Sequence, residues 1–418
     1  MAWLSRKAGT RVMTNKSAVG SNNSDLTEMN RSAIVKILQQ RDVCSRAEIA
    51  KITGLTQASI TKITAVLIEM GIVSEVGTIK GNGNRRSIGL RLNAEEKQVI
   101  GVKFSRHMFA VGVFDISGKL YTMRETEFEL EQDTREVLTD MKDQIHETLK
   151  KYKNVVAIGL ALPGPYIREE GRIAMVTSMP KWHDINFIDE FKNEFNKPLF
   201  IEQDANAGAL AEWWFGNHGR PLNTLAYFLA GEGVGSGIVE NDNLLLGMQG
   251  VASEVGHISI DVNGPRCECG NYGCLELYCC ASAMLERAKQ EMPDLMNKKY
   301  KNRAEACGDV FEEARRGNRK AGKVVDEIAN YLAYGCVTLI NAYNPDIIVI
   351  GDIISMGGDL LLPTIKETVQ ARVIPEMYEK VKIEFSKLSV DPTLYGAAAI
   401  ATDRLLRKPS EYLKANQK

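Results

Sequence analysis

Residues 254–257 read EVGH, and nine residues further on residues 267–276 read CECGNYGCLE. Together they place one histidine and three cysteines in the spacing H-x9-C-x-C-x4-C. Two thiolates one residue apart, a third thiolate one turn later and an imidazole from another element can close a tetrahedron around zinc. The spacing therefore predicts that His257, Cys267, Cys269 and Cys274 bind zinc. Four protein ligands leave no open coordination position, so the metal is expected to be structural.

The cysteine usage also bounds the alternatives for this cluster. The chain has eight cysteines at uneven spacing, three of them within eight residues. A metal site in a reducing cytoplasm fits this distribution better than a disulfide framework does. A disulfide, or cysteines that are simply reduced and buried, are the other readings of the same residues.

Length and charge indicate more than one domain. A chain of 418 residues exceeds one ordinary core, and its apolar content of 44% and charged content of 25% are ordinary for a globular protein. Residues 1–92 carry 14 Lys and Arg against 6 Asp and Glu, whereas the remainder carries 38 against 47. A basic N-terminal segment on an acidic body favours a nucleic-acid-binding module. With no apolar run long enough for a membrane span or a secretory signal, we expect a cytoplasmic protein without membrane insertion.

Residues 24–92 predict a winged helix-turn-helix that follows a flexible basic arm at residues 1–23. A first helix is expected over about residues 25–40, with Leu26, Met29, Ile34, Ile37 and Leu38 among its buried residues. The sequence SRAE at 45–48 is a capping box that starts a second helix, which ends at Gly54. A third helix follows Thr56 and ends at Gly71. Residues 72–76 and 87–92 then predict a β-hairpin around a basic, glycine-rich tip.

The DNA-reading positions follow from this assignment. In a helix-turn-helix, the first turns of the second helix of the motif meet base edges in the major groove. The wing tip suits phosphates or a narrow minor groove. A winged helix can also be a protein–protein module, but the third helix has no acidic residue before Glu69. The predicted DNA contacts are Thr56, Gln57, Ala58, Ser59, Thr61, Lys62, Arg85 and Arg86.

From residue 99 onward the pattern changes to α/β. Residues 101–118 and 224–247 read as the same hairpin, which suggests a duplicated fold with two lobes. Residues 347–350 predict a buried strand after a helix at about 321–343, and alternating strands and helices favour mostly parallel sheets. The expected domains are a first lobe at 93–208 with about 390–404, a second lobe at 209–389 with the zinc site and dimerisation helices, and a tail at 405–418.

The EVGH and CECGNYGCLE segments closely resemble the signature of the ROK family (repressors, open reading frames, kinases). The resemblance extends over essentially the whole chain, because the winged helix, the LPGP turn at 162–165 and QDANA at 203–207 occur in the family's order. It implies an actin-like, ribonuclease H-like sugar-kinase fold of two lobes, with a sugar in the cleft between them. By position, the resemblance assigns sugar binding to Gln203, Asp204, Glu254, His257 and Glu276. Gln203 stands where the family usually has Asn.

The resemblance also argues against kinase activity. Asp204 occupies the position of the kinase base, here vestigial. Where family kinases have D-x-G-G-T, the chain has Lys103, Phe104, Ser105, Arg106 and His107. In the second turn Glu232 places a negative charge where a phosphate would sit, and Asp352 replaces glycine in the third. We therefore expect no enzyme, an unphosphorylated sugar, and a salt bridge between Glu232 and Lys103. The four remaining histidines, His218 among them, have no partner motif.

These observations predict a repressor of carbohydrate-metabolism genes that binds operator DNA as a homodimer or tetramer. A sugar between the lobes would change the affinity for the operator. Two alternatives remain open: a repressor relieved by a protein of the sugar-transport phosphotransferase system, and a residual sugar kinase.

Overall fold

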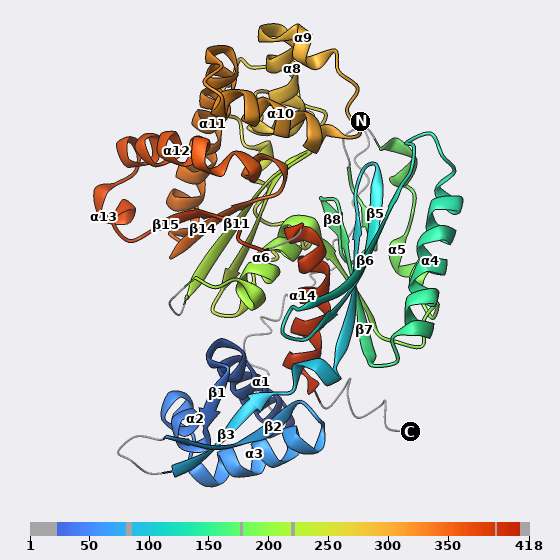
Figure 1. Cartoon of the computed structure of the whole chain (residues 1–418), viewed down its shortest axis with the longest axis vertical. Coiled ribbons are helices and arrows are strands. Elements are labelled where there is room, and N and C mark those ends of the chain that lie inside the picture. Colours follow the sequence, from blue (N-terminus) through green and yellow to red (C-terminus); the bar gives the residue numbers. More distant parts are fainter. Residues whose placement is uncertain (1–22, 81–85, 176–178, 219–221, 389–390, 410–418) are drawn as a thin grey trace, which may run out of the picture.

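The computed structural model describes residues 23–80, 86–175, 179–218, 222–388 and 391–409. Figure 1 shows an N-terminal module below two larger lobes, each built on a five-stranded sheet. The first 22 residues of the predicted arm, the wing tip with Arg85, and residues 410–418 of the predicted tail lie outside the described ranges. Within those ranges, no helix has the length and apolar character needed to cross a membrane.

The N-terminal module has the predicted order of helices and strands. Its elements are α1 (Asn23–Arg41), β1 (Val43–Ser45), α2 (Arg46–Thr53), α3 (Gln57–Glu69), β2 (Val73–Lys80) and β3 (Arg86–Leu92). Ser45 and Glu48 form the predicted capping box at the start of α2, and Gly54 ends that helix with φ of 71°. The strands form an antiparallel sheet in the order β1-β3-β2, which includes one strand more than the predicted hairpin.

The buried face of α1 differs from the prediction. Leu26 and Met29 were expected inside, but they are 46% and 65% exposed. Ile34 and Leu38 are buried as expected, and Val35, which lay off the predicted stripe, is buried as well. The reason is that α1 packs against α3 and β3 within the module and also against α14 of the body. A second packing partner buries a second side of the helix, and a single-stripe pattern does not predict it.

The first lobe is built on a sheet in the order β10-β7-β4-β5-β6. The strands β10, β7 and β4 are parallel, and β5 and β6 continue the sheet antiparallel. Its strands are β4 (Gln98–Phe104), β5 (Met108–Asp115), β6 (Leu120–Glu127), β7 (Val155–Leu162) and β10 (Leu199–Gln203), with β8 (Tyr166–Ile167) and β9 (Arg172–Ile173) as a small hairpin. Its helices are α4 (Thr134–Lys151), α5 (Phe187–Phe191) and the short turns η2 (Ala94–Glu96) and η3 (Pro180–Trp182).

The second lobe repeats this plan with the order β13-β12-β11-β14-β15. Its strands are β11 (Thr224–Ala230), β12 (Val234–Glu240), β13 (Asn243–Leu244), β14 (Ile347–Gly351) and β15 (Lys382–Phe385). Its helical elements are η4 (Val255–His257), α7 (Glu276–Cys279), α8 (Ala281–Glu291), α9 (Pro293–Met296), α10 (Arg303–Arg315), α11 (Arg319–Tyr343), η5 (Ile353–Gly357), α12 (Gly358–Arg372) and α13 (Pro375–Tyr378). Each sheet joins three parallel strands to two antiparallel ones, so the expectation of mostly parallel sheets holds for only part of each.

Two helices lie between the sheets and hold the lobes together. Helix α14 (Pro392–Arg407) packs on β4 and β7 of the first sheet, and α6 (Asp204–Phe215) packs on β11 and β12 of the second. The two helices pack directly on each other. A Cβ at Gly396 would lie 2.4 Å from the backbone of Ala207, so this crossing requires glycine. The domain boundaries expected at residues 208 and 404 fall inside these two helices.

Candidate functional site

A cavity of about 440 Å³ opens between the two lobes. The first lobe lines it with the turn after β4, with Gly164 and with the start of α6. The second lobe contributes the turn between β11 and β12, η4 and the start of α7. All five residues that the resemblance assigned to sugar binding line this one cavity: Gln203, Asp204, Glu254, His257 and Glu276. The fold thus brings together residues up to 73 positions apart in the sequence.

Gln203 links the two sides of the cavity. It ends β10 and stands at the N-cap of α6, and its Nε2 donates a hydrogen bond to Glu254 Oε1 over 2.9 Å. The side chain is 4% exposed, and its Oε1 has no hydrogen-bond partner among the described residues. A Cβ at Gly164 would lie 2.2 Å from Gln203 Nε2, so the longer side chain fits because residue 164 is glycine.

Two carboxylates of the cavity have perturbed acidity. Burial raises the pKa of Asp204 to about 7, and the nearby charges of Asp352 and Glu254 add to this rise. The backbone N–H of Ala205 and the Lys103 ammonium oppose it. Burial likewise raises the pKa of Glu254, against the hydrogen bond from Gln203. Both groups can therefore exchange protons nearer to neutral pH than ordinary carboxylates do.

Glu276 is held in place by the opposite wall of the cavity. Its Oε2 accepts a hydrogen bond from the backbone N–H of Val234 over 2.8 Å. A Cβ at Gly233 would lie 2.7 Å from the same oxygen. The carboxylate thus has one fixed partner and keeps further acceptor capacity for hydroxyl groups of a ligand.

The three turns that correspond to the kinase phosphate turns meet in this cavity, but their charges pair differently from our expectation. The predicted salt bridge between Lys103 and Glu232 is absent from the described residues. Instead, Lys103 pairs with Asp391 at the start of α14. Glu232 pairs with Arg303 of α10 and lies 3.7 Å from Arg106. The prediction was wrong because Asp391 and Arg303 are distant in sequence, and folding brings each closer to its partner than Lys103 and Glu232 are to each other.

The charge environment of Lys103 is strongly acidic. Burial alone would lower the pKa of this lysine, but the neighbouring charges of Asp391 and Asp352 raise it above its usual value. Burial raises the pKa of Asp352, while Lys103 opposes that rise. Lys103 is therefore a charged lysine already committed to carboxylates of the chain itself.

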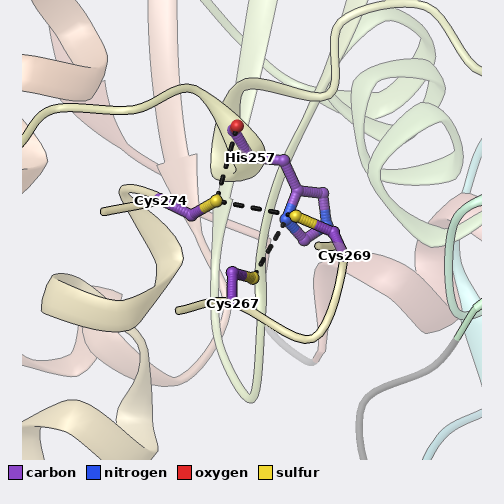
Figure 2. A group of neighbouring side chains, drawn as sticks. All are labelled: His257, Cys267, Cys269 and Cys274. Atoms are coloured by element: carbon purple, nitrogen blue, oxygen red, sulfur yellow. Dashed lines mark hydrogen bonds between the residues drawn. The ribbon is translucent and has the colours of Figure 1, made fainter. Parts of the chain in front are cut away.

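The four predicted metal ligands form one cluster, shown in Figure 2. One ligand atom from each of His257, Cys267, Cys269 and Cys274 lies within 4.8 Å of all the others. His257 Nδ1 is 3.7 Å from Cys267 Sγ, and the Sγ atoms of Cys269 and Cys274 are 3.6 Å apart. Three thiols and an imidazole at this separation fit a tetrahedral ion after small side-chain movements.

The backbone of the cysteine loop explains how such short spacing closes. Gly273 has φ of 61°, and a Cβ there would lie 1.7 Å from the carbonyl oxygen of Asp261. Asn271 Nδ2 donates to the carbonyl oxygen of His257 over 2.9 Å and so fixes the loop against η4. His257 belongs both to the cluster and to the cavity lining. A metal bound in the cluster would therefore orient one wall of the cavity.

The predicted DNA-contact residues lie at the start of α3, with two of them engaged in capping. Thr56 Oγ1 accepts from the Ser59 backbone N–H over 3.2 Å and lies 2.9 Å from Ser59 Oγ. Gln57, Ala58, Thr61 and Lys62 are exposed, Ser59 is half-buried, and Arg86 is exposed at the start of β3. The exposed side chains leave one face of α3 open for contact, whereas Thr56 and Ser59 serve the helix start.

Sequence reasoning missed the partners of His218. This side chain is only 7% exposed, its Nδ1 lies 2.8 Å from Glu384 Oε1, and its Nε2 lies 3.4 Å from Glu212 Oε2. Burial would lower the pKa of His218, but hydrogen bonds to the two carboxylates raise it. The sequence holds no signal for this group, because Glu384 is 166 residues away. Lys36 and Gln39 of α1, which contact the lobes, were missed for the same reason.

Comparison with known proteins covers both parts of the chain. The sequence pattern of the ROK family matches residues 99–404. A xylose repressor of Caldicellulosiruptor bescii is 29% identical over 93% of this chain and 99% of its own length. A glucokinase of Thermotoga maritima is 31% identical over 74% of this chain and 98% of its own length.

A solved structure agrees with these relatives. The crystal structure described as a ROK family transcriptional regulator, homolog of the E. coli MLC protein, has a TM-score of 0.75 and 26% identity. It covers 93% of this chain and 100% of its own chain. The matched pattern extends over more than half of the sequence, and relatives of full length share the arrangement. The chain therefore belongs to the ROK family.

Proposed function

We propose that this chain is a sugar-responsive transcriptional repressor of carbohydrate-metabolism genes. Its N-terminal module would read operator DNA as a winged helix-turn-helix. A sugar in the cavity between the lobes would change the affinity for that operator. The observation that carries the proposal is the presence, in one chain, of an exposed α3 face and an acidic cavity between two lobes.

The extent of the relatives supports the repressor assignment. The repressor and the regulator match over 93% of this chain, whereas the glucokinase matches over 74%. The part that distinguishes them has the size of the N-terminal module. The basic charge of residues 1–92 adds an independent argument, because such a module attracts phosphate backbones.

The cavity chemistry favours a neutral sugar as the effector. Asp204, Glu254 and Glu276 supply carboxylate oxygens that accept hydrogen bonds from vicinal hydroxyl groups. Lys103, Arg106 and Arg303, which could bind a phosphate, are paired with Asp391 and Glu232. A phosphorylated sugar would have to break these pairs and approach the negative charge of Glu232.

The same pairs argue against a sugar kinase. Asp204 keeps the position and the raised pKa of a general base, which is the observation in favour of kinase activity. The turn at 103–107 has no glycine to let the backbone approach a phosphate, and Glu232 fills the second turn. We infer that phosphoryl transfer is lost while sugar binding is retained.

Zinc and dimerisation complete the proposal. The His257–Cys274 cluster would hold structural zinc through three thiolates and one imidazole. Two chains would pair so that their modules meet the two half-sites of a palindromic operator.

The experiment is a fluorescence anisotropy titration. Genomic DNA fragments retained by the purified protein are labelled and then challenged with a panel of neutral pentoses and hexoses and their phosphates. Release by a neutral sugar is the expected result. Failure to retain any DNA would overturn the repressor assignment. Tight operator binding that no sugar changes would point to a phosphotransferase protein as the signal. ADP production from ATP with any sugar of the panel would establish the kinase instead.

A further inference from the structure

Helix α1 of the N-terminal module is attached to the lobes through a desolvated contact. Gln39 Nε2 donates to the backbone carbonyl oxygen of Trp214, the penultimate residue of α6, over 2.7 Å. Lys36, one turn earlier, pairs with Asp242 Oδ1 over 2.8 Å, and its ammonium lies 5.5 Å from the centre of the Trp214 ring. The Lys36 side chain is 14% exposed, so this is a packed contact and not a loose surface ion pair.

The contact joins elements of both lobes. Asp242 belongs to the two-residue turn between β12 and β13 of the second lobe. Trp214 Nε1 donates to Asp403 Oδ1 of α14 over 3.0 Å. Arg407 of α14 pairs with Asp403 over 2.7 Å and donates to the backbone carbonyl oxygen of Asp242. Lys36 is therefore bonded at the point where α6, α14 and the second sheet meet.

Helix α6 connects this point to the cavity. Gln203 and Asp204 at its start line the cavity, and Trp213 and Trp214 lie at its other end. A helix of 12 residues extends about 18 Å. Its packing leaves little slack, because a Cβ at Gly208 would lie 2.2 Å from the Tyr227 ring. A displacement at the cavity end is therefore passed on to the Trp214 end as a rigid movement.

The N-terminal module also has room to move. A groove of about 1170 Å³ lies between the module and the lobes, lined on one side by α1 and β3 and on the other by residues 213–218. Lys119 and Glu95 form an ion pair at this groove, but both are exposed and neither belongs to α1 or α6. A rotation of the module about its α1 contact would open or close this groove without disturbing a core.

We propose that Lys36, Gln39, Trp214, Asp242 and Arg407 form a relay junction that converts sugar binding into a change in the orientation of the DNA-binding module. This inference rests on the proposed function. A sugar held between Gln203 and Glu254 draws the lobes together and moves α6 and the β12–β13 turn relative to α14. Lys36 bonds to that turn and packs on α6, so α1 follows them and carries α3 with it.

The test separates coupling from binding. We would measure the operator dissociation constant with and without saturating sugar, and the sugar dissociation constant, for the wild type, Lys36→Met and Asp242→Asn. The coupling ratio is the operator dissociation constant with sugar divided by that without it; such ratios are typically about 5 to 150. Both variants are expected to lower the ratio at least about fivefold while each dissociation constant without the other ligand changes less than about threefold.

The variants are chosen to keep the fold. Met retains the apolar stem of Lys36 against Trp214, and Asn tolerates the left-handed backbone of residue 242, where φ is 71°. Lys119→Met is the matched control, because it removes a lysine–carboxylate pair from the same groove, and its ratio should stay at the wild-type value. Wild-type ratios in both Lys36→Met and Asp242→Asn would overturn the relay junction. A wild-type protein with a ratio of one would instead contradict the proposed function.

Discussion

Gln203 and Glu254 face each other across the cavity, and the Gln203 Nε2 hydrogen bond to Glu254 Oε1 joins the first lobe to the second over 2.9 Å. The other amide atom, Gln203 Oε1, is buried without a partner among the described residues. An unsatisfied buried acceptor costs about 1–3 kcal/mol, and a sugar hydroxyl that donates to it would recover this free energy. The pair is therefore both a bridge between the lobes and an incomplete binding site.

Substitution Glu254→Ala should abolish the response to the sugar and preserve operator binding. It removes the acceptor for Gln203 and for a sugar hydroxyl, and hydrogen bonds to charged groups contribute about 1.5–3 kcal/mol. The sugar affinity should therefore fall about ten- to hundredfold, as measured by isothermal titration calorimetry. Glu240→Ala, an exposed carboxylate at the end of β12, is the control and should leave the affinity unchanged. If operator binding were lost together with sugar binding, Glu254 would have a structural role.

Substitution Cys269→Ala should release the metal and weaken sugar binding. Cys269 is the exposed member of the cluster, so its removal disturbs the apolar packing least. We expect bound zinc, measured by atomic absorption, to fall from about one ion per chain to a small fraction of that. The melting temperature and the sugar affinity should fall as well, because His257 is shared with the cavity.

The control for the metal experiment is Cys336→Ala, a buried cysteine of α11 outside the cluster. It should lower the melting temperature through lost packing but keep the full metal content. Retention of zinc in Cys269→Ala, with the same melting temperature as the wild type, would show that Cys269 is not a ligand.

Local signals in the sequence were reliable for the fold. The capping box of Ser45 and Glu48 and the left-handed Gly54 depend on neighbours within four residues, and all three occur as predicted. The cluster around His257 was also accessible, because its spacing carries the chemistry. The exposed start of α1 with Leu26 shows the limit, since helical periodicity does not say how far a helix extends past its packing partners.

Contacts between distant residues could not be predicted in the same way. Lys103 and Asp391 are 288 residues apart, and their pairing depends on how α14 returns to the first sheet. Glu232 finds Arg303 because α10 packs beside the cavity, which no motif encodes. The charges of these residues were correctly judged unsuited to phosphate binding, but their partners follow from the packing of whole elements.

Substitutions at the module should separate reading of the sequence from attraction to the backbone. Gln57→Ala removes a side chain at the start of α3 that can contact adenine, and a bidentate base contact contributes about 1–3 kcal/mol. The operator affinity should fall about five- to hundredfold, with relaxed preference at one base pair. Arg86→Ala should weaken binding to all sequences and reduce the salt dependence by about one counterion.

Anisotropy titrations at several salt concentrations distinguish these two effects. Lys150→Ala, on the exposed surface of α4, is the control for a lost positive charge and should change neither quantity. Equal loss of affinity for operator and random DNA in Gln57→Ala would mean that Gln57 does not read a base.

Sugar binding should depend on pH through Asp204, whose pKa is raised to about 7 by burial and by the charges of Asp352 and Glu254. The carboxylate accepts hydrogen bonds from sugar hydroxyl groups only in its charged form, which is lost as the pH falls through about 7. Between pH 8 and pH 6 the charged fraction falls about tenfold, so the sugar affinity should fall about tenfold. Isothermal titration calorimetry across this range measures it.

Two variants tie this dependence to Asp204. Asp204→Asn, which cannot ionise, should bind the sugar weakly and show a flat profile over the same range. Asp352→Asn removes a neighbouring negative charge and should move the midpoint to lower pH without abolishing the dependence, because Lys103 then stabilises the charged form with less opposition. Tighter sugar binding at pH 6 than at pH 8 would reverse the assignment, since the protonated Asp204 would then act as a hydrogen-bond donor to the sugar.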